Sequence, residues 1–348
     1  MKLRYRFGDT VTTFEQEDSR HQERLNTLLT NKKGDFLTTG IKENQTKYQG
    51  YHILDGNALC VYKILDTIRV PDREAYDVEF GGYFARRKLH TGDGQTSQQT
   101  PTMDRTYLGP TGGIIYEIEQ YQGPIQIDLD CRGKDDFDEW GRIYELEEQD
   151  GTFYVTYTKY LGEEPQYHLY VGIRPQHGSL RALQQWIRKE YPYSQARNSL
   201  SVWYVHRIAE VSVEGSERLI IAAGFSKEEV DEQLQLLGGH QEELEAFDIE
   251  LHEQLARPPM LAHPVPQTVE LGTRAAGMAL NHFTAKDLPL KHLNQGAYAG
   301  IPWFADIWAR DEIISLKAFM LAGEESFVKE RIYAYLKQID PQTGTLKR

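Results

Sequence analysis

The chain of 348 residues has a mass of 40.2 kDa, enough for about two domains, and 40% of its residues are hydrophobic. Its formal net charge of −13, from 52 acidic and 39 basic residues, argues against nucleic-acid binding, because phosphates need a basic surface. No segment approaches the ~18 consecutive apolar residues of a membrane-spanning helix, and the first residues lack the apolar core of a secretion signal. We therefore expect a soluble, cytoplasmic protein with neither nucleic acid nor a membrane as partner.

The two cysteines, Cys60 and Cys131, stand in unrelated contexts and lack the paired spacing of a disulfide framework or a zinc site. We expect both to be buried as small hydrophobic residues. The histidines likewise show no ligand-like spacing. The sequence therefore predicts neither a metal site nor a cofactor.

Residues 1–225 consist of short segments in which apolar and polar residues alternate, as in Phe153, Val155 and Tyr157. This alternation places every second side chain on the same face of a sheet and is typical of strands. Steps that contain glycine separate several segments and suit tight hairpin turns. These steps are residues 55–57, 150–151 and 214–216. The pattern predicts an N-terminal antiparallel β-sandwich domain over residues 1–225.

The period becomes helical after residue 225. Ser226 precedes Glu229 in a capping-box arrangement, and Leu244, Phe247, Leu251 and Leu255 recur at helical spacing. Residues 226–257 contain ten acidic residues against Lys227 and Arg257, which we interpret as a solvated helix face. Several prolines over residues 258–266 end the pattern. We predict an acidic helical linker over residues 226–266.

The last part of the chain, residues 267–348, predicts a helical domain. Apolar residues at helical spacing indicate three helices, over residues 268–283, 311–321 and 325–339. Asp340-Pro341 ends the third helix.

Residues 296–312 form the segment that is richest in chemistry. They contain two tryptophans, two glycines, a proline, an arginine and three acidic residues. Indole faces stack on the C–H face of a sugar ring, while arginine and aspartate hydrogen-bond adjacent hydroxyls. A structural interpretation is equally open: acids in the first turn of a helix gain from its dipole, and Trp303 and Phe304 could fill a core.

The residues 299–304, Ala-Gly-Ile-Pro-Trp-Phe, followed by Trp308-Ala309-Arg310-Asp311, resemble a motif of the archaeal and bacterial glycogen debranching enzymes. These amylo-α-1,6-glucosidases carry A-G-x-P-W-F followed by W-x-R-D. The resemblance implies their fold: an N-terminal antiparallel β-sandwich, followed here by the first helices of an incomplete (α/α)6 barrel related to that of glucoamylases.

The resemblance also implies a site. Arg310 and Asp311 would bind the hydroxyls of a terminal glucose, and Trp303 and Trp308 would wall its subsite. The catalytic general acid and base come from later barrel helices in this clan, so we expect them beyond Arg348. Only about 80 residues follow the linker, far fewer than twelve helices require. We do not assign Glu312 or Glu324 to catalysis.

The implied function is that of the N-terminal part of a glycogen-debranching α-glucosidase that hydrolyses terminal α-1,6-glucosyl links with inversion. Its partners would be an α-glucan or a glycogen-derived oligosaccharide and a second polypeptide that completes the barrel. Ile307 lengthens the spacing between Trp303 and Trp308, and Ala309 replaces a frequent glycine. These departures leave open a related hydrolase of small α-glycosides, such as trehalose or mannosylglycerate. A non-catalytic chain that binds glucan or docks a partner is the other alternative.

Overall fold

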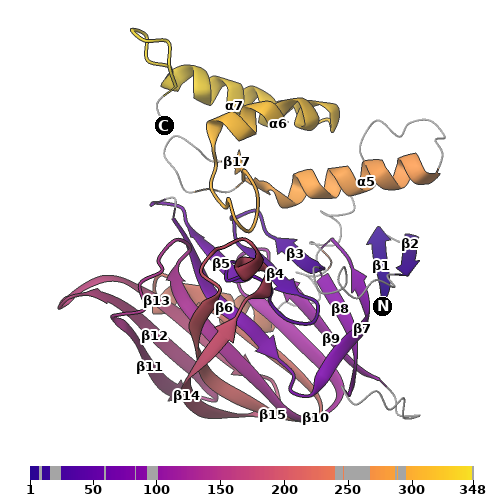
Figure 1. Ribbon diagram of the computed structural model, residues 1–348, viewed down its shortest axis with the longest axis vertical. Helices are drawn as coiled ribbons and strands as arrows, with labels where there is room; N and C mark the ends of the chain where they lie inside the picture. Colours follow the sequence, from indigo (N-terminus) through magenta and orange to yellow (C-terminus); the bar gives the residue numbers. More distant parts are fainter. Residues whose placement is uncertain are drawn as a thin grey trace.

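The computed structural model describes residues 1–7, 10–15, 25–58, 60–82, 84–91, 101–239, 246, 267–286, 288 and 295–346. Within these ranges fifteen strands form one hydrogen-bonded sheet (Figure 1). They are β1 (Lys2–Phe7), β2 (Thr10–Glu15), β3 (Asn26–Thr30), β4 (Phe36–Gly40), β5 (Gly50–Asp55), β6 (Cys60–Arg69), β7 (Arg73–Phe80), β8 (Phe84–Thr91), β9 (Thr102–Leu108), β10 (Ile114–Gly133), β11 (Arg142–Gln149), β12 (Thr152–Leu161), β13 (Glu164–Pro175), β14 (Ser179–Glu190) and β15 (Val202–Gly224).

The two longest strands, β10 and β15, organise the sheet because their two halves have different neighbours. The first part of β10 pairs with β9 and the last part with β6. The first part of β15 pairs with β14 and the last part with β13. The sheet therefore splits into two branches that share β10 and β15. One branch continues through β11 to β13 and through β9, β8, β7, β1 and β2, and the other through β14 and through β6, β5, β4 and β3.

The two branches share a single apolar core. Buried side chains of one branch, such as Leu65 on β6, belong to the same cluster as Val155 on β12 of the other branch. The strand-rich fold that alternation predicts is thereby confirmed. The strand pairs are antiparallel except for β1 and β7, which run parallel and depart from the expected wholly antiparallel arrangement.

Two of the three predicted turns are confirmed. A turn joins β5 to β6, and in it the Asp55 carboxylate accepts a hydrogen bond from the backbone N–H of Asn57. Asp150 and Gly151, both with positive φ, join β11 to β12. The turn predicted at residues 214–216 is wrong, because these residues lie inside β15. Gly215 has a φ of 100° and faces the point where β10 bulges at Gln120, so its conformational freedom serves a bulge instead of a turn.

The expectation for the cysteines is half right. Cys131 is buried in the core, but Cys60 is exposed. Cys60 is the first residue of β6 and pairs with Asp55 at the turn end of the β5–β6 hairpin.

Helix α3 (Lys227–Gly239) begins at the predicted capping box. The hydroxyl of Ser226 accepts a hydrogen bond from the N–H of Glu229, and the Glu229 carboxylate accepts one from the N–H of Phe225. Val230 and Leu234 are buried against the sheet, so this part of the acidic segment packs on β13 and β15. The helical pattern predicted from Leu244 to Leu255 lies outside the described residues.

The three predicted C-terminal helices are confirmed to within two residues at each end. They are α5 (Gln267–His282), α6 (Ala309–Leu321) and α7 (Glu325–Gln338). Figure 1 shows them lying together beyond one side of the sheet. Phe319 of α6 and Phe327 of α7 pack with ring centroids 4.7 Å apart. None of the helices in the described part of the chain is long and apolar enough to cross a membrane.

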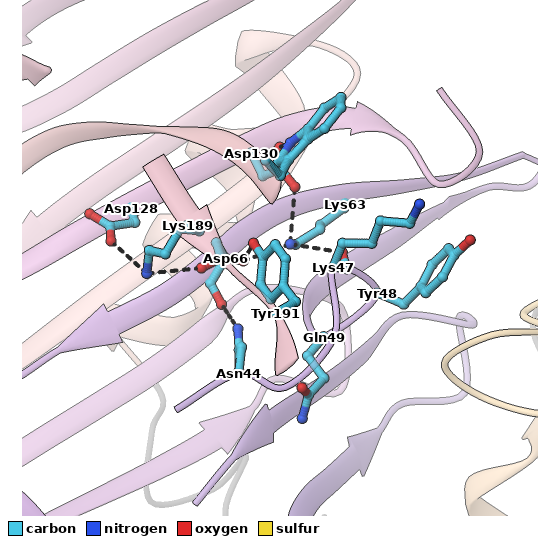
Figure 2. Close-up of polar contacts among 12 residues, drawn as sticks. Asn44, Lys47, Tyr48, Gln49, Lys63, Asp66, Asp128, Asp130, Lys189 and Tyr191 are labelled. Atoms are coloured by element: carbon cyan, nitrogen blue, oxygen red, sulfur yellow. Dashed lines mark hydrogen bonds and ion pairs between the residues drawn. The ribbon is translucent and has the colours of Figure 1, made fainter. Parts of the chain in front are cut away.

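A network of buried charges crosses the sheet next to the short helix α2 (Pro192–Ala196), as Figure 2 shows. Lys63 contacts the carboxylates of Asp66 at 2.7 Å and Asp130 at 3.0 Å. Asp130 also contacts Arg132 and Arg142, both at 3.0 Å. Burial opposes the charge of Asp130, but Arg132, Lys63 and Arg142 together hold its pKa below the ordinary value. The charges are therefore retained inside the fold because each has several partners.

We expect Asp130→Asn to lower the free energy of unfolding by about 3–5 kcal/mol, because buried cations lose their shared anion. The matched control is Glu210→Gln, which removes a carboxylate that pairs with the exposed Arg181 and should change stability by no more than about 1 kcal/mol. Urea unfolding at neutral pH measures both. Equal effects of the two substitutions would contradict a stabilising role for the buried network.

Candidate functional site

The segment of residues 296–312 runs from the short strand β17 (Gly296–Ala297) to the first turn of α6. β17 pairs with β16 (Thr284–Ala285) directly after α5. The backbone of the segment folds back on itself, because Ala299 donates to the carbonyl of Asp306 at 2.9 Å and Gly300 to that of Phe304 at 3.0 Å. The peptide bond between Ile301 and Pro302 is cis. The result is a closed loop that carries Trp303 and Phe304.

This loop is docked on the sheet. Tyr298 donates a hydrogen bond from its hydroxyl to the carbonyl of Gly34 at 2.6 Å and packs edge-on against Phe36. Ile301 is buried in the same apolar cluster as Phe36. Asp306 forms an ion pair of 3.0 Å with Lys134, the residue that follows β10. Contacts between residues far apart in the sequence therefore fix the position of the loop relative to the sheet.

Glu312 fixes the other end of the segment. Its buried carboxylate accepts hydrogen bonds from the N–H of Ala297 at 2.8 Å and from the guanidinium of Arg331 at 2.9 and 2.6 Å. The hydroxyl of Tyr335 is a further donor. Glu312 thus ties the start of α6 to α7 and to β17, which explains this acidic residue structurally.

The four residues singled out by the motif fall into two groups. Trp303 is half-buried, with its ring 6.0 Å from that of Tyr193 and 5.8 Å from the guanidinium of Arg197. Trp308 lies at the N-terminus of α6, where 44% of its surface is exposed, and its ring is 5.8 Å from that of Phe304. Of the two residues that could fill a core, Phe304 is 49% exposed and does not do so, whereas Trp303 is half-buried.

Arg310 and Asp311 follow in the first turn of α6. The Arg310 side chain is 76% exposed, and its guanidinium lies 3.5 Å from the Asp311 carboxylate. The Oδ2 atom of Asp311, the atom that faces Arg310, is buried, and none of the described residues donates a hydrogen bond to it. The Asp311 side chain as a whole is 35% exposed, so a ligand can approach the carboxylate from its exposed part.

Sequence reasoning missed the residues that the sheet contributes here. Tyr193 and Arg197 belong to α2 and the residues after it, and Lys134 belongs to the turn after β10. No local pattern distinguishes them, because their proximity to Trp303 and Asp306 is created by the tertiary fold.

A separate cavity of about 1150 Å³ opens between the two branches of the sheet. Apolar residues such as Leu29 and Leu65 line it together with basic residues such as Arg73 and Arg87. Trp303, Trp308, Arg310 and Asp311 are not among its lining residues, so this cavity is distinct from the motif. In the described ranges, no three His, Cys, Asp or Glu side chains lie close enough to share a metal ion.

Comparison with known proteins gives a fold and no family. Neither a family model nor a curated protein matches the sequence. A bacterial glucoamylase whose structure was solved with acarbose is similar over 92% of this chain and 54% of its own, with a TM-score of 0.54 and 12% identity. The chain therefore has a glucoamylase-like fold and spans about half the length of that enzyme.

Weaker similarities, with TM-scores of 0.44 and 0.36, are too low to argue from. One is to a family GH92 inverting mannosidase of Bacteroides thetaiotaomicron, at 9% identity over 76% of this chain and 38% of that one. The other is to a protein of the human microbiome provisionally named a kojibiose phosphorylase, at 9% identity over 73% of this chain and 36% of that one.

The buried Lys47, which lies between β4 and β5, allows a pH-dependent test of its own burial next to Phe137. Its ammonium lies 3.7 Å from the ring centroid of Phe137. Burial, followed by the positive charge of Arg132, lowers the pKa of Lys47 to about 8. The unfolded chain therefore binds more protons than the folded chain between about pH 8 and pH 10.5, and the Lys47 contribution to stability rises with pH across this window.

We expect Lys47→Met to remove this rise. The free energy of unfolding of the unaltered protein, measured relative to the variant by urea unfolding at pH 7.5, 8.5 and 9.5, should increase with pH. Tyrosine ionisation near pH 10 affects both proteins and cancels in the difference. A difference that stays constant across the three values would show that the Lys47 ammonium is not desolvated.

Proposed function

We propose that the chain is the N-terminal part of a glucoamylase-like α-glucosidase of the debranching type, an enzyme that hydrolyses terminal α-1,6-glucosyl links with inversion. The glucoamylase-like fold supports an enzyme that acts on glycosides. The observation that carries the proposal is the placement of Trp308, Arg310 and Asp311 together at the start of α6, where the Trp308 ring and the Arg310 side chain are exposed and the Asp311 side chain is 35% exposed.

Each of the four residues has a role in this proposal. The exposed indole of Trp308 stacks on the C–H face of the terminal glucose, and Trp303 forms the wall on the side of the sheet. The Asp311 carboxylate accepts a hydrogen bond from one glucose hydroxyl, and Arg310 donates to a neighbouring hydroxyl. These groups bind and orient the sugar; the reacting carboxylates lie elsewhere.

Inverting hydrolysis requires two carboxyl groups about 6.5–9.5 Å apart. One protonates the glycosidic oxygen while the other takes a proton from the attacking water, so the bond from C1 to oxygen breaks as water adds on the opposite face. Glu312 does not suit either role, because Arg331, Tyr335 and Ala297 already hold its carboxylate. We propose that both carboxylates belong to the part of the barrel that this chain does not span.

The exposed surface of α6 and α7 supports the proposal that further barrel helices pack on this chain. Large apolar side chains stay exposed on both helices, whereas such residues in a barrel pack against neighbouring helices. They are Ile313, Ile314, Met320, Leu321, Ile332, Tyr333 and Leu336. We propose that the remaining barrel helices, on a second polypeptide or a further segment, cover these residues.

A non-catalytic chain that binds α-glucan is the second candidate. The hydrogen bonds that occupy the Glu312 carboxylate favour this candidate, because they leave the segment of residues 296–312 with sugar-binding groups and without an available general acid or base. Glucan binding alone does not separate the two candidates, whereas glucose release does.

We expect Asp311→Asn to weaken the binding of isomaltose by roughly 10- to 100-fold, because a charged acceptor contributes about 1.5–3 kcal/mol to a hydrogen bond. Calorimetric titration measures the affinity. The matched control is Glu325→Gln, at an exposed acidic residue in the first turn of α7, which should leave the affinity unchanged. An Asp311→Asn chain that binds as tightly as the unaltered chain would remove Asp311 from the site.

The catalytic part of the proposal is tested by mixing the chain with the polypeptide that supplies the remaining barrel helices. Glucose release from a branched limit dextrin should appear only in the mixture and should disappear with Asp311→Ala. Binding without glucose release in the mixture would instead support the non-catalytic candidate.

A further inference from the structure

We propose that four aromatic side chains at the junction of the sheet and the loop, namely Tyr48, Phe137, Tyr193 and Trp303, form a platform that binds further glucose units of an α-glucan. This platform rests on the proposed function, since it extends the terminal-glucose site toward the sheet. Nothing in the motif predicts it, because three of the four rings come from the sheet and its connections.

The rings form two pairs. Tyr193 and Trp303 have centroids 6.0 Å apart at an interplanar angle of 50°, and Arg197 lies 5.8 Å from both centroids. Tyr48 and Phe137 have centroids 6.2 Å apart at 84°. Figure 2 shows Tyr48 next to Lys47, with both side chains extending away from the buried carboxylates of the sheet.

The two pairs belong to one region. Burial and the charge of Asp135 raise the pKa of Tyr48, while Arg132, Lys134 and Arg197 oppose the rise, so the hydroxyl of Tyr48 lies within the field of the same Arg197 that contacts the other pair. The geometry agrees, because the N–H of Tyr193 donates to the carbonyl of Gln45, three residues before Tyr48, and the ammonium of Lys47 lies 3.7 Å from the ring centroid of Phe137.

One backbone hydrogen bond and one ion pair hold these segments in place. The N–H of Tyr193 donates to the carbonyl of Gln45 at 3.0 Å, which joins α2 to the loop that carries Tyr48. Lys134 binds Asp306 at 3.0 Å, which joins the turn after β10 to the loop that carries Trp303. The platform is therefore positioned before any ligand arrives, and preorganisation lowers the entropic penalty of binding.

Exposure separates the platform from the core beneath it. Trp203, whose ring lies 6.3 Å from that of Phe137, is only 1% exposed, whereas Phe137 is 37% exposed. Tyr48, Tyr193 and Trp303 are also partly exposed. Part of each ring of the platform is therefore accessible to a ligand.

The polar groups between the rings suit a sugar with many hydroxyls. Asp135 and Arg197 are exposed and offer an acceptor and several donors beside the ring faces. Aromatic faces that stack on C–H surfaces, together with hydrogen-bonding groups at their edges, are the chemistry that recognises a neutral oligosaccharide. Because the platform includes Trp303, a chain whose terminal glucose occupies the proposed site would place its third and later units here.

The test compares a short and a long ligand on the full 348-residue chain. Isomaltose and a maltohexaose with one α-1,6-linked terminal glucose are titrated calorimetrically against the unaltered protein, Tyr193→Ala, Phe137→Ala and Phe137→Leu. We expect the long ligand to bind at least 10-fold more tightly than isomaltose to the unaltered protein. Each substitution should reduce the affinity for the long ligand by about 5-fold while leaving that for isomaltose unchanged.

Phe137→Leu retains apolar volume without a flat ring, so it keeps the test decisive if Phe137→Ala does not fold. The matched control is Tyr76→Ala, at an exposed tyrosine on β7, which should alter neither affinity. If Tyr193 and Phe137 only stabilise the fold, their substitution lowers the stability to urea and leaves the ratio of the two affinities unchanged. That result would overturn the platform.

The outcomes also separate this inference from the proposed function. Equal affinity of the unaltered protein for the two ligands, with isomaltose binding that depends on Asp311, contradicts the platform alone. A second outcome is that Tyr193→Ala lowers the affinity for the long ligand while Asp311→Asn leaves the affinity for isomaltose unchanged. This outcome supports the platform and contradicts the terminal-glucose site. Failure of the unaltered protein to bind either ligand contradicts both.

Discussion

The docking of the loop of residues 298–306 onto the sheet is the contact on which the functional geometry depends. The hydroxyl of Tyr298 reaches the carbonyl of Gly34, and Ile301 is buried beside Phe36. Because these partners lie more than 260 positions apart in the sequence, the helical part of the chain is held against the first strands of the sheet. Together with the ion pair between Lys134 and Asp306, this contact defines the position of Trp303 relative to the sheet.

A second constraint acts at the opposite end of the same segment. Glu312, Arg331 and Tyr335 form a buried cluster that joins α6 to α7. A buried ion pair is weak evidence for stability by itself, but it specifies one arrangement, because any other leaves a charge without a partner. The site therefore sits on a segment that is fixed at both ends, with Trp308, Arg310 and Asp311 presented at the start of a helix. Such support is what a binding site requires if its groups are to meet a ligand in one geometry.

Local patterns in the sequence predicted much of the fold. Helical spacing located α5, α6 and α7 because their apolar faces repeat with the helical period, and the capping box located the start of α3 because its hydrogen bonds are local. The turn predicted at residues 214–216 was wrong because a glycine with positive φ serves a bulge as well as a turn. The split of the sheet at β10 and β15 could not be read from alternation, which identifies strands without their neighbours.

The candidate site was predictable to a smaller extent. The motif identified Trp303, Trp308, Arg310 and Asp311 because they are close in sequence, and their assignment to a glucose site stays a prediction. The groups that surround Trp303, including Tyr193 and Arg197, were beyond sequence reasoning because only the docked loop brings them together. Cys60 shows the same limit on a smaller scale, since its exposure depends on what covers the end of a hairpin.

The most direct measurement is a crystal structure of the chain with bound isomaltose. We predict that the terminal glucose ring lies on the indole of Trp308, with one of its hydroxyls within hydrogen-bond distance of the Asp311 carboxylate. Electron density for the sugar at another place, such as the cavity between the branches of the sheet, with the four motif side chains directed away from it, would contradict the account.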